Sequence, residues 1–247
     1  MEAEKLLERK IKNPDFGVLS GSRMYGTDVG GSDFDVRGFI VVPMVYKMGL
    51  YNKGGGRYNF EVADRDSDGV DLHISSFEKW LGSVLKGNVQ PTEILFAPED
   101  NIQNLSEFGS KVLDNKEQLL SKNIYSSIRG YAKGEKRRAL GKTTGRLGGK
   151  RKTDLEEFGY VRKNAYHMVR LLDQGEELLR TGQITFPRPN VDLLMDLREG
   201  ELSRDEVENH FIIYNKRIED TMDDAVLPED PDYEFANHLI RESYSFS

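Results

Sequence analysis

Residues 18–39 read VLSGSRMYGTDVGGSDFDVRGF and join two apolar stretches through a turn of small residues. Gly21 and Ser22 follow the first stretch, where a missing or small side chain lets backbone N–H groups approach an anion closely. Asp33 and Asp35 open the second stretch. Because side chains alternate faces along a strand, both carboxylates are expected to project from the same side. Two such carboxylates beside a turn that suits phosphate indicate a divalent metal ion and a nucleotide.

The composition is that of a soluble globular protein. The chain has 247 residues, 31% of them charged and 37% hydrophobic, and its net charge of −7 disfavours indiscriminate binding to nucleic acid, so any such contact must be local. The absence of cysteine excludes disulfides, thiolate metal sites and cysteine nucleophiles. The sequence starts MEAEKLLERKIK, a pattern typical of an amphipathic helix rather than a signal peptide, and no run of roughly 20 apolar residues occurs. We therefore expect a cytoplasmic protein.

Short apolar stretches bounded by turn residues predict strands at residues 16–20, 36–42 and 70–74. Apolar side chains at helical spacing predict a helix over residues 77–85. The glycine-rich residues 44–69 are expected to form an insertion or a loose hairpin.

The second half of the chain has a different pattern. After Leu105 the strand pattern ends and apolar side chains recur at helical spacing. The sequence therefore predicts an α+β protein whose strands lie in residues 1–115 and whose residues 116–247 form a helical domain.

Asp71, on the predicted strand at residues 70–74, supplies a third carboxylate. Phosphoryl-transfer enzymes with two metal ions use carboxylates to hold the cations about 3.5–4 Å apart, one at the attacking hydroxyl and one at the leaving group. Asp33 and Asp35 would bridge both ions, and Asp71 would hold the ion nearest the nucleophile and accept its proton.

These motifs resemble a known family. The run GSRMYGTDVGGSDFDVRGF is similar to the nucleotidyltransferase signature of the DNA polymerase beta superfamily, a Gly-Ser turn followed by a hydrophobic-flanked Asp-x-Asp. More narrowly, the chain resembles the nucleotidyltransferases associated with bacterial and phage RNA-repair operons. That resemblance rests on YGT, SDFDVRG, FEKWLGSVLKGNVQPTEILF and FGYVRKNAYHMVRLL.

The resemblance implies a mixed five-stranded, polymerase-beta-like sheet followed by a C-terminal helical domain. It also implies transfer of a nucleotidyl group from an NTP, ATP included, with release of pyrophosphate. Two Mg²⁺ ions, with Mn²⁺ as an alternative, would be held by Asp33, Asp35 and Asp71, which are the predicted catalytic residues. Gly21, Ser22 and Arg23 would bind the nucleotide. RNA, either tRNA or a 3′ end under repair, is the implied acceptor.

A second set of candidate nucleotide-binding residues lies on the predicted helix around residues 158–172. Lys163, His167 and Arg170 are spaced to share one face of that helix. In the family-derived interpretation this face meets the triphosphate or the acceptor. The alternative is a solvated face, because the apolar side chains of the helix form another stripe.

Residues 129–152 read RGYAKGEKRRALGKTTGRLGGKRK, with ten Lys and Arg and a single Glu. The glycine content predicts a mobile segment. In an acidic protein such a block is either a solvated loop or a contact for a polyanion, and we expect it to contact the RNA acceptor.

Other interpretations stay open at this stage. The same active site can nucleotidylate a protein hydroxyl, as toxin-like members of the superfamily do, or the chain can be a non-catalytic nucleotide- or RNA-binding module. Residues 64–69 resemble the start of a calcium loop, but Ser75 stands where that loop needs a bidentate Glu, so a polar turn is predicted. The choice of NTP, the number of nucleotides added and the oligomeric state do not follow from the sequence.

Overall fold

The computed structural model describes residues 11–43, 61–65, 70–142 and 149–246. The chain divides into two compact units. Unit 1 consists of Met1–Ser121 together with Asp230–Ser247, and unit 2 consists of Lys122–Glu229. The predicted boundary at residue 115 therefore lies six residues before the end of the first segment of unit 1. The structure also differs from the prediction at the C-terminus, because residues 230–247 belong to unit 1 and not to the helical unit.

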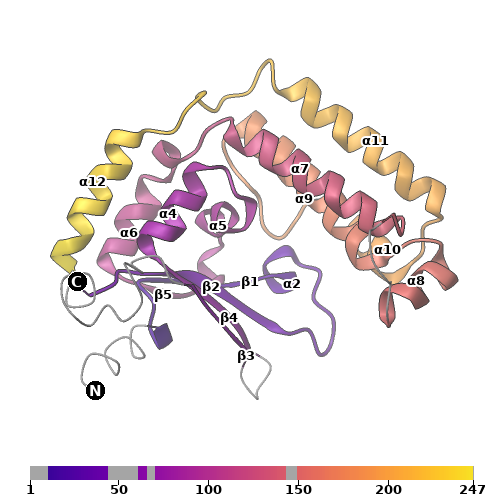
Figure 1. Ribbon diagram of the computed structural model, residues 1–247, viewed down its shortest axis with the longest axis horizontal. Coiled ribbons are helices and arrows are strands. Elements are labelled where there is room, and N and C mark those ends of the chain that lie inside the picture. Colours follow the sequence, from indigo (N-terminus) through magenta and orange to yellow (C-terminus); the bar gives the residue numbers. More distant parts are fainter. Residues whose placement is uncertain (1–10, 44–60, 66–69, 143–148, 247) are drawn as a thin grey trace. The chain divides into compact units, whose positions relative to one another are not determined.

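The described part of unit 1 is built on a five-stranded sheet with the order β3-β4-β2-β1-β5 (Figure 1). The strands β2 and β4 are parallel, and the other neighbouring pairs are antiparallel. This mixed sheet, with helices on it and a helical unit elsewhere in the chain, confirms the predicted α+β fold class. The strands are β1 (Phe16–Ser20), β2 (Phe34–Ile40), β3 (Glu61–Arg65), β4 (Val70–Ser76) and β5 (Ile102–Leu105).

The strand predictions are confirmed in most respects. The bounds of β1 agree with the prediction, β2 begins at Phe34 rather than Val36, and β4 extends two residues beyond Ile74. The short β5 was not predicted, because its two middle residues are polar and its four residues show no alternation of apolar and polar side chains. The strand β3 lies within the glycine-rich stretch, whose residues 44–60 and 66–69 are outside the described residues.

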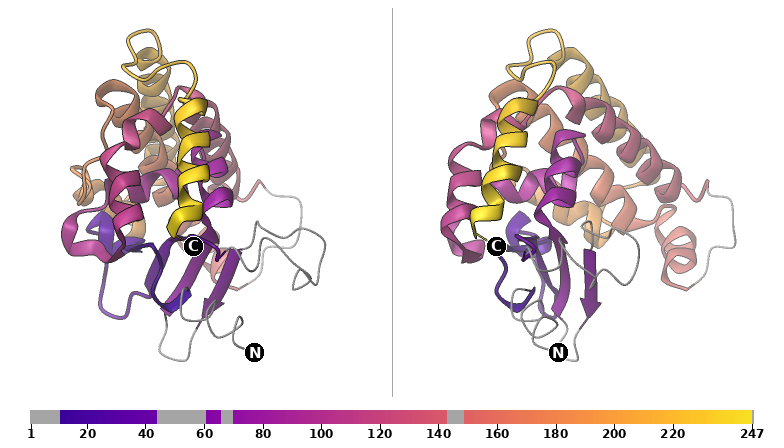
Figure 2. Two further views of the ribbon diagram at one scale, coloured as in Figure 1. Left: turned by 90° about the vertical axis from the view of Figure 1, so that its left-hand side faces the viewer. Right: turned by 60° about the vertical axis from the view of Figure 1, so that its left-hand side comes forward.

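Helices cover the face of the sheet that carries Phe39. The ring centroid of Phe39 lies 5.1 Å from that of Phe77 and 4.6 Å from that of Trp80, and both partners come from α4. Phe16 and Phe108 complete a fully buried aromatic cluster. Figure 2 shows α12 running alongside α4. The α-helices in the described part of unit 1 are α2 (Ser22–Tyr25), α4 (Phe77–Leu85), α5 (Val89–Glu93), α6 (Glu107–Asp114) and α12 (Tyr233–Ser243).

The opposite face of the sheet has its own apolar cluster. Ile40, Val42 and Ile74 are buried there, with Leu72 and Ile11 packed against them. Because neighbouring residues of a strand point to opposite faces, Phe39 and Ile40 anchor β2 on both sides of the sheet. The apolar end of β2 is thus fixed, and its acidic start lies at the other end.

Unit 2 is helical in all of its regular described structure. Its central helix, α9, is packed against α7, α10 and α11. The helices are α7 (Asn123–Ala139), α8 (Lys150–Phe158), α9 (Arg162–Thr181), α10 (Val191–Glu199) and α11 (Arg204–Thr221).

The prediction of a mobile segment at residues 129–152 is wrong for much of its length. Residues 129–139 belong to α7, and residues 150–152 begin α8. Ala132, Glu135 and Ala139 are buried along one side of α7, so tertiary packing overrides the low helix propensity of the glycines. Residues 143–148 lie outside the described residues.

In the described part of the chain, no helix is both long enough and apolar enough to cross a membrane.

Gly175 in α9 marks the closest approach of three helices. A Cβ added there would lie 2.8 Å from Ile218 Cδ1 of α11, and closer still to Ile128 Cδ1 of α7. Alanine is normally favoured over glycine inside a helix by about 1 kcal/mol. Here the overlap with two buried side chains outweighs that gain, since overpacking a core costs about 1–3 kcal/mol.

We therefore expect Gly175→Ala to lower the free energy of unfolding, measured by urea denaturation. Adding Ile128→Val should restore part of the loss, because valine lacks the Cδ1 atom that overlaps. The matched control is Gly130→Ala in α7, where an added Cβ meets nothing within 4 Å and should stabilise the protein. Equal stabilisation by both alanine substitutions would contradict this packing.

Candidate active site

Asp35 and Asp71 lie opposite each other on the adjacent parallel strands β2 and β4. Residues paired in this way project their side chains to the same face of the sheet. Both side chains belong to half-buried residues, whereas Asp33 is exposed and directly precedes β2. The structure thus brings Asp35 and Asp71 together and places Asp33 at the entrance to the same strand.

The turn after β1 lies against the Asp35 carboxylate. Ser20 pairs with Asp35 in the sheet, and its hydroxyl donates a hydrogen bond of 3.2 Å to the Asp35 carbonyl. Gly21 has φ 70° and ψ −150°. A Cβ at this position would lie 2.9 Å from Asp35 Cγ and would overlap Oδ2. Two separate constraints therefore favour glycine at position 21: the positive φ of the backbone and the lack of room for a Cβ beside the Asp35 carboxylate.

The short helix α2 is anchored in the core of unit 1. Met24 and Tyr25 are buried, and the Tyr25 hydroxyl donates a 2.6 Å hydrogen bond to Glu93 Oε1. Ser22 begins this helix, and its carbonyl accepts from the backbone N–H of Thr27 at 2.9 Å. The Gly21–Ser22 turn is therefore anchored to the core of unit 1 beside Asp35, and its contact with a phosphate stays a prediction.

Arg23 has a structural role that the sequence did not indicate. Its guanidinium carbon lies 3.9 Å from the centre of the Phe34 ring, and Nη2 donates to the Ser32 carbonyl at 3.2 Å. Nη1 also lies 3.9 Å from Asp28 Oδ2. These contacts tie α2 to the loop that leads into the Asp-x-Asp motif. Contact between Arg23 and a nucleotide stays a prediction.

His73 is a neighbour of Asp71 that the sequence reasoning missed. His73 Nε2 lies 3.2 Å from Asp71 Oδ1. The sequence did contain a signal for this contact, because Asp71 and His73 are two residues apart on a predicted strand and such residues share a face. Arg37 pairs with His73 across β2 and β4, and its Nη1 donates to Gln90 Oε1 at 3.3 Å. A neighbouring imidazole at this distance can orient a carboxylate, as the side chains around metal ligands do.

The carboxylate oxygens on this face are the type of ligand that suits Mg²⁺. Carboxylate oxygens are the ligands that Mg²⁺ prefers, and one or two carboxylates with water and substrate phosphates commonly complete its shell. Asp35 and Asp71 supply two carboxylates from facing positions. Within the described residues, no group of three or more His, Asp or Glu side chains is arranged to hold a metal ion by itself. The three-carboxylate set with Asp33 is therefore a prediction, and mutual repulsion of the carboxylates opposes it until cations and substrate are present.

The second group of candidates lies on α9 of unit 2. Lys163, His167 and Arg170 are spaced along one face of this helix, as predicted. Lys163 is exposed, whereas Arg170 is only 4% exposed and donates a hydrogen bond to Gln174 one turn later. Arg170 is thus part of the interior of unit 2, although the apolar stripe alone did not require it there.

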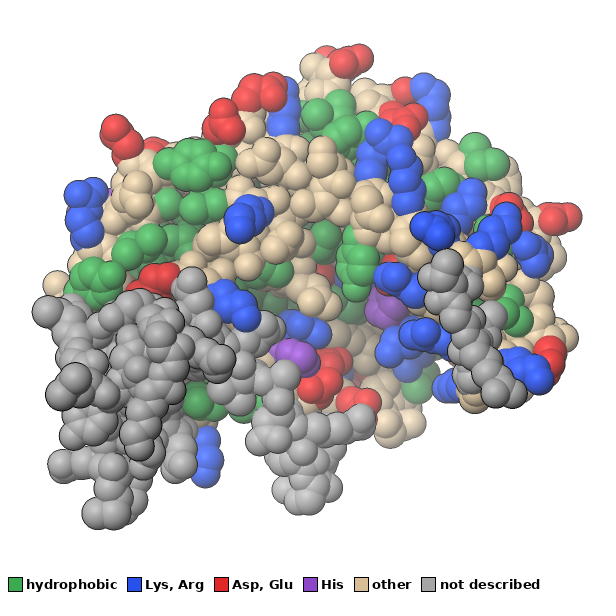
Figure 3. All heavy atoms as spheres, viewed as in Figure 1, with side chains coloured by type: hydrophobic (Ala, Val, Ile, Leu, Met, Phe, Trp, Pro, Cys, Tyr) green, Lys and Arg blue, Asp and Glu red, His purple; other side chains and the backbone are tan. Residues whose placement is uncertain are grey.

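His167 lies among cations contributed by several helices. The pKa of His167 is lowered to about 3, chiefly by burial and then, in decreasing order, by the positive charges of Arg170, Lys163, Arg198 and Arg138. The imidazole is therefore neutral near pH 7, and any contact that it makes with a nucleotide uses a neutral ring. Figure 3 shows Lys and Arg side chains gathered over the helices of unit 2. Such a concentration of positive charge favours an anion.

We expect Gly21→Ala to disturb the candidate site directly, because the added Cβ and the positive φ both displace the Asp35 carboxylate. Mg²⁺-dependent binding of a non-hydrolysable NTP, measured by calorimetry, should weaken by about tenfold or more. Gly82→Ala in α4 is the control, since a Cβ there meets nothing within 4 Å. Unchanged binding by a folded Gly21→Ala protein would show that this turn does not support the carboxylate.

One of three comparisons with known proteins gives a match. A search of curated proteins and a search of solved structures each give no significant match. A family model described as the RNA repair pathway DNA polymerase beta family matches residues 15–242, which include the turn, the carboxylate strands and the α9 helix. The chain belongs to the RNA repair pathway DNA polymerase beta family.

Proposed function

We propose that this protein transfers a nucleotidyl group from an NTP to a hydroxyl of RNA, with release of pyrophosphate. Family membership supports a nucleotidyltransferase-like role. The single observation that carries the proposal is the facing pair Asp35 and Asp71 on parallel strands, with Gly21 against the Asp35 carboxylate.

In the proposed reaction, the acceptor oxygen forms a bond to the α-phosphorus while the bond from that phosphorus to the bridging oxygen breaks. Mg²⁺ ions, if bound there, would supply positive charge for activation of the hydroxyl and for neutralisation of the leaving pyrophosphate. Asp33, Asp35 and Asp71 would hold the ions. Asp71 would accept the hydroxyl proton, and the His73 contact would keep its carboxylate oriented.

The turn in unit 1 and α9 in unit 2 carry the remaining candidates for contact with a nucleotide. Backbone N–H groups of Gly21 and Ser22 would orient the triphosphate, as glycine-rich turns at helix starts do. In unit 2, Lys163 of α9 would offer a positive charge to a phosphate group, and His167 would offer a hydrogen bond from its neutral ring. Arg170 and Arg23 would act chiefly by shaping their surroundings, because both are engaged within the protein.

RNA is the proposed acceptor on two grounds. The description of the family names an RNA repair pathway, and the chain concentrates basic residues at residues 129–152 despite its net negative charge. Phosphate contacts supply most sequence-independent affinity for nucleic acid, so such a block suits RNA.

Replacing Asp33 and Asp35 with Asn should abolish transfer of labelled nucleotide, because the amides cannot neutralise the metal charge. Asp71→Asn alone should lower the rate by about a thousandfold or more. Thermal unfolding should show that each variant is folded, and Asp114→Asn, at an exposed residue ending α6, is the control for loss of one acid. Full activity of the Asp33→Asn/Asp35→Asn protein would refute the assignment.

Incubating labelled NTPs with total RNA and with total protein identifies the acceptor class. The proposal expects label in RNA that depends on Mg²⁺ or Mn²⁺. Label confined to protein would replace RNA by a protein hydroxyl. No labelled product, together with no metal-dependent nucleotide binding, would instead support a non-catalytic module.

A further inference from the structure

One face of α7 combines cations with glycines. Gly130, Lys133, Gly134 and Arg137 follow the spacing i, i+3, i+4, i+7, which places them on a single side of the helix. The buried residues of α7 lie elsewhere on its circumference. We call this set of four residues the α7 outer face.

The two cations of the α7 outer face are exposed and lack acidic partners. Within the described residues, no carboxylate pairs with Lys133 or Arg137. Their neighbours three and four residues away along α7 include no acid. Their charge is therefore available to an external anion.

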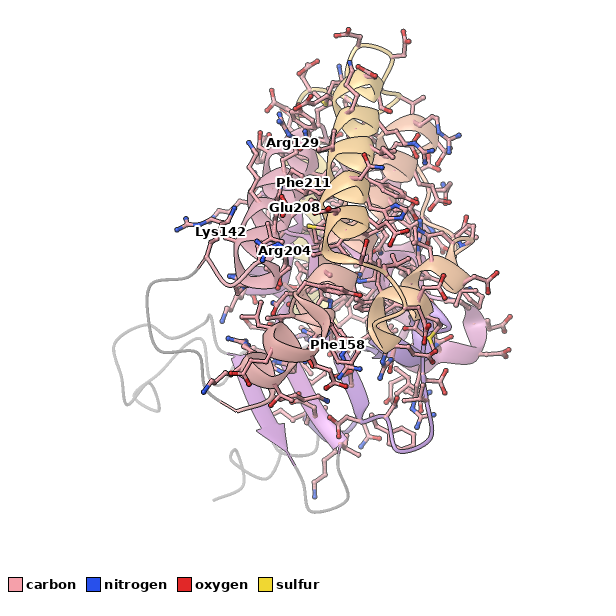
Figure 4. The ribbon with its side chains drawn as sticks, turned by 90° about the vertical axis from the view of Figure 1, so that its right-hand side faces the viewer. Arg129, Lys142, Phe158, Arg204, Glu208 and Phe211 are labelled. Atoms are coloured by element: carbon pink, nitrogen blue, oxygen red, sulfur yellow. The ribbon has the colours of Figure 1, made fainter. Side chains whose placement is uncertain are left out.

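The other cations of α7 differ in this respect, because each already has a contact within unit 2. Figure 4 shows Arg129 on α7 and Phe211 on the neighbouring α11. Arg129 pairs with Glu219, Arg138 pairs with the buried Glu135 at 2.8 Å, and Lys136 Nζ lies 4.0 Å from the centre of the Phe211 ring. The contrast separates cations used in folding from cations left for a ligand.

Internal packing does not explain the two glycines. A Cβ at Gly130 would meet nothing within 4 Å, and one at Gly134 would meet only the end of the Arg138 side chain at 3.6 Å or more. Glycine is destabilising inside a helix relative to alanine, so its presence at both positions lowers the stability of α7. A helix surface without side chains does, however, let an extended backbone approach closely between the flanking cations.

Tyr131 borders this face and is 41% exposed. No ring contact or hydrogen bond of Tyr131 occurs among the described side chains. An exposed aromatic ring beside a line of cations is the arrangement that single-stranded nucleic-acid binders use, because any unpaired base can stack on it.

We propose that the α7 outer face binds the phosphate backbone of single-stranded RNA and that Tyr131 stacks on an unpaired base. The proposal rests on the proposed function for the choice of RNA as acceptor. Because the whole protein has a net charge of −7, the positive charge of this face does not simply reflect an excess of basic residues in the chain. Lys142, which follows α7, is exposed and points away from the helices in Figure 4.

Fluorescence anisotropy with the full chain and a labelled single-stranded RNA of mixed sequence tests the charge contribution. The measurement is made in EDTA without NTP, so it does not depend on catalysis. Lys133→Gln/Arg137→Gln should weaken binding by about tenfold, and the slope of log K against log salt should fall by about 1.4, since each phosphate contact contributes about 0.7 for single strands.

The matched control removes two charges from elsewhere on unit 2. Arg180 and Arg204 are exposed cations that are paired with Glu176 and Glu208. Arg180→Gln/Arg204→Gln has the same net charge as the test variant and should keep both the affinity and the salt slope of the wild type. Equal weakening by both double variants would overturn the proposal in favour of general electrostatic attraction.

The glycine variants distinguish a binding role from a structural one. Gly130→Ala/Gly134→Ala should raise the thermal stability and yet weaken RNA binding, because the methyl groups stand between the helix and the phosphates. Tyr131→Ala should weaken binding by about tenfold, whereas Tyr131→Phe should retain it, since stacking needs the ring and not the hydroxyl.

Several results would overturn the proposal. These are unchanged RNA affinity in Lys133→Gln/Arg137→Gln, tighter binding of duplex than of single-stranded RNA, and competition by polyglutamate as effective as by single-stranded RNA. Asp33→Asn/Asp35→Asn should bind RNA like the wild type. A wild-type protein that binds RNA through α7 but transfers no nucleotide would therefore refute the catalytic assignment alone.

Discussion

The parallel pairing of β2 with β4 is the constraint on which the candidate active site depends, because it sets Asp35 opposite Asp71. Side chains alternate along a strand, so a slip of one residue would turn one carboxylate to the other face of the sheet. The register is fixed by apolar packing away from the charges. Phe39 lies in the aromatic cluster on one face, and Ile40 packs with Ile74 on the other. Burial at one end of the strands thus positions the acidic groups at the other.

The sequence was sufficient to predict the parts of unit 1 that depend on local patterns. Strand β1, the turn at Gly21 and the acidic start of β2 all follow from side chains adjacent in the chain. The contacts of Arg23 and His73 did not follow, because each depends on which groups the fold brings near. The same is true of β5, since its polar residues form a strand only by pairing with β1.

In unit 2, tertiary packing buries some charged side chains and leaves others exposed, although they look alike in the sequence. The basic stretch suggested a mobile loop, yet its first part is a helix with one buried side. Glu135, the only acid of the stretch, lies on that side and is joined to Arg138 and Asn164. Arg170 is likewise drawn inside, where it bonds Gln174. Spacing alone could place these residues on helix faces, but it could not show which face is buried.

We propose that the carboxylates of unit 1 hold the catalytic metal ions. Electron paramagnetic resonance of Mn²⁺, titrated into the protein with a non-hydrolysable NTP, tests it most directly. Two bound ions per chain are expected in the wild type, with loss of binding in Asp35→Asn and in Asp71→Asn. Equal Mn²⁺ binding by wild type and both variants would contradict the account.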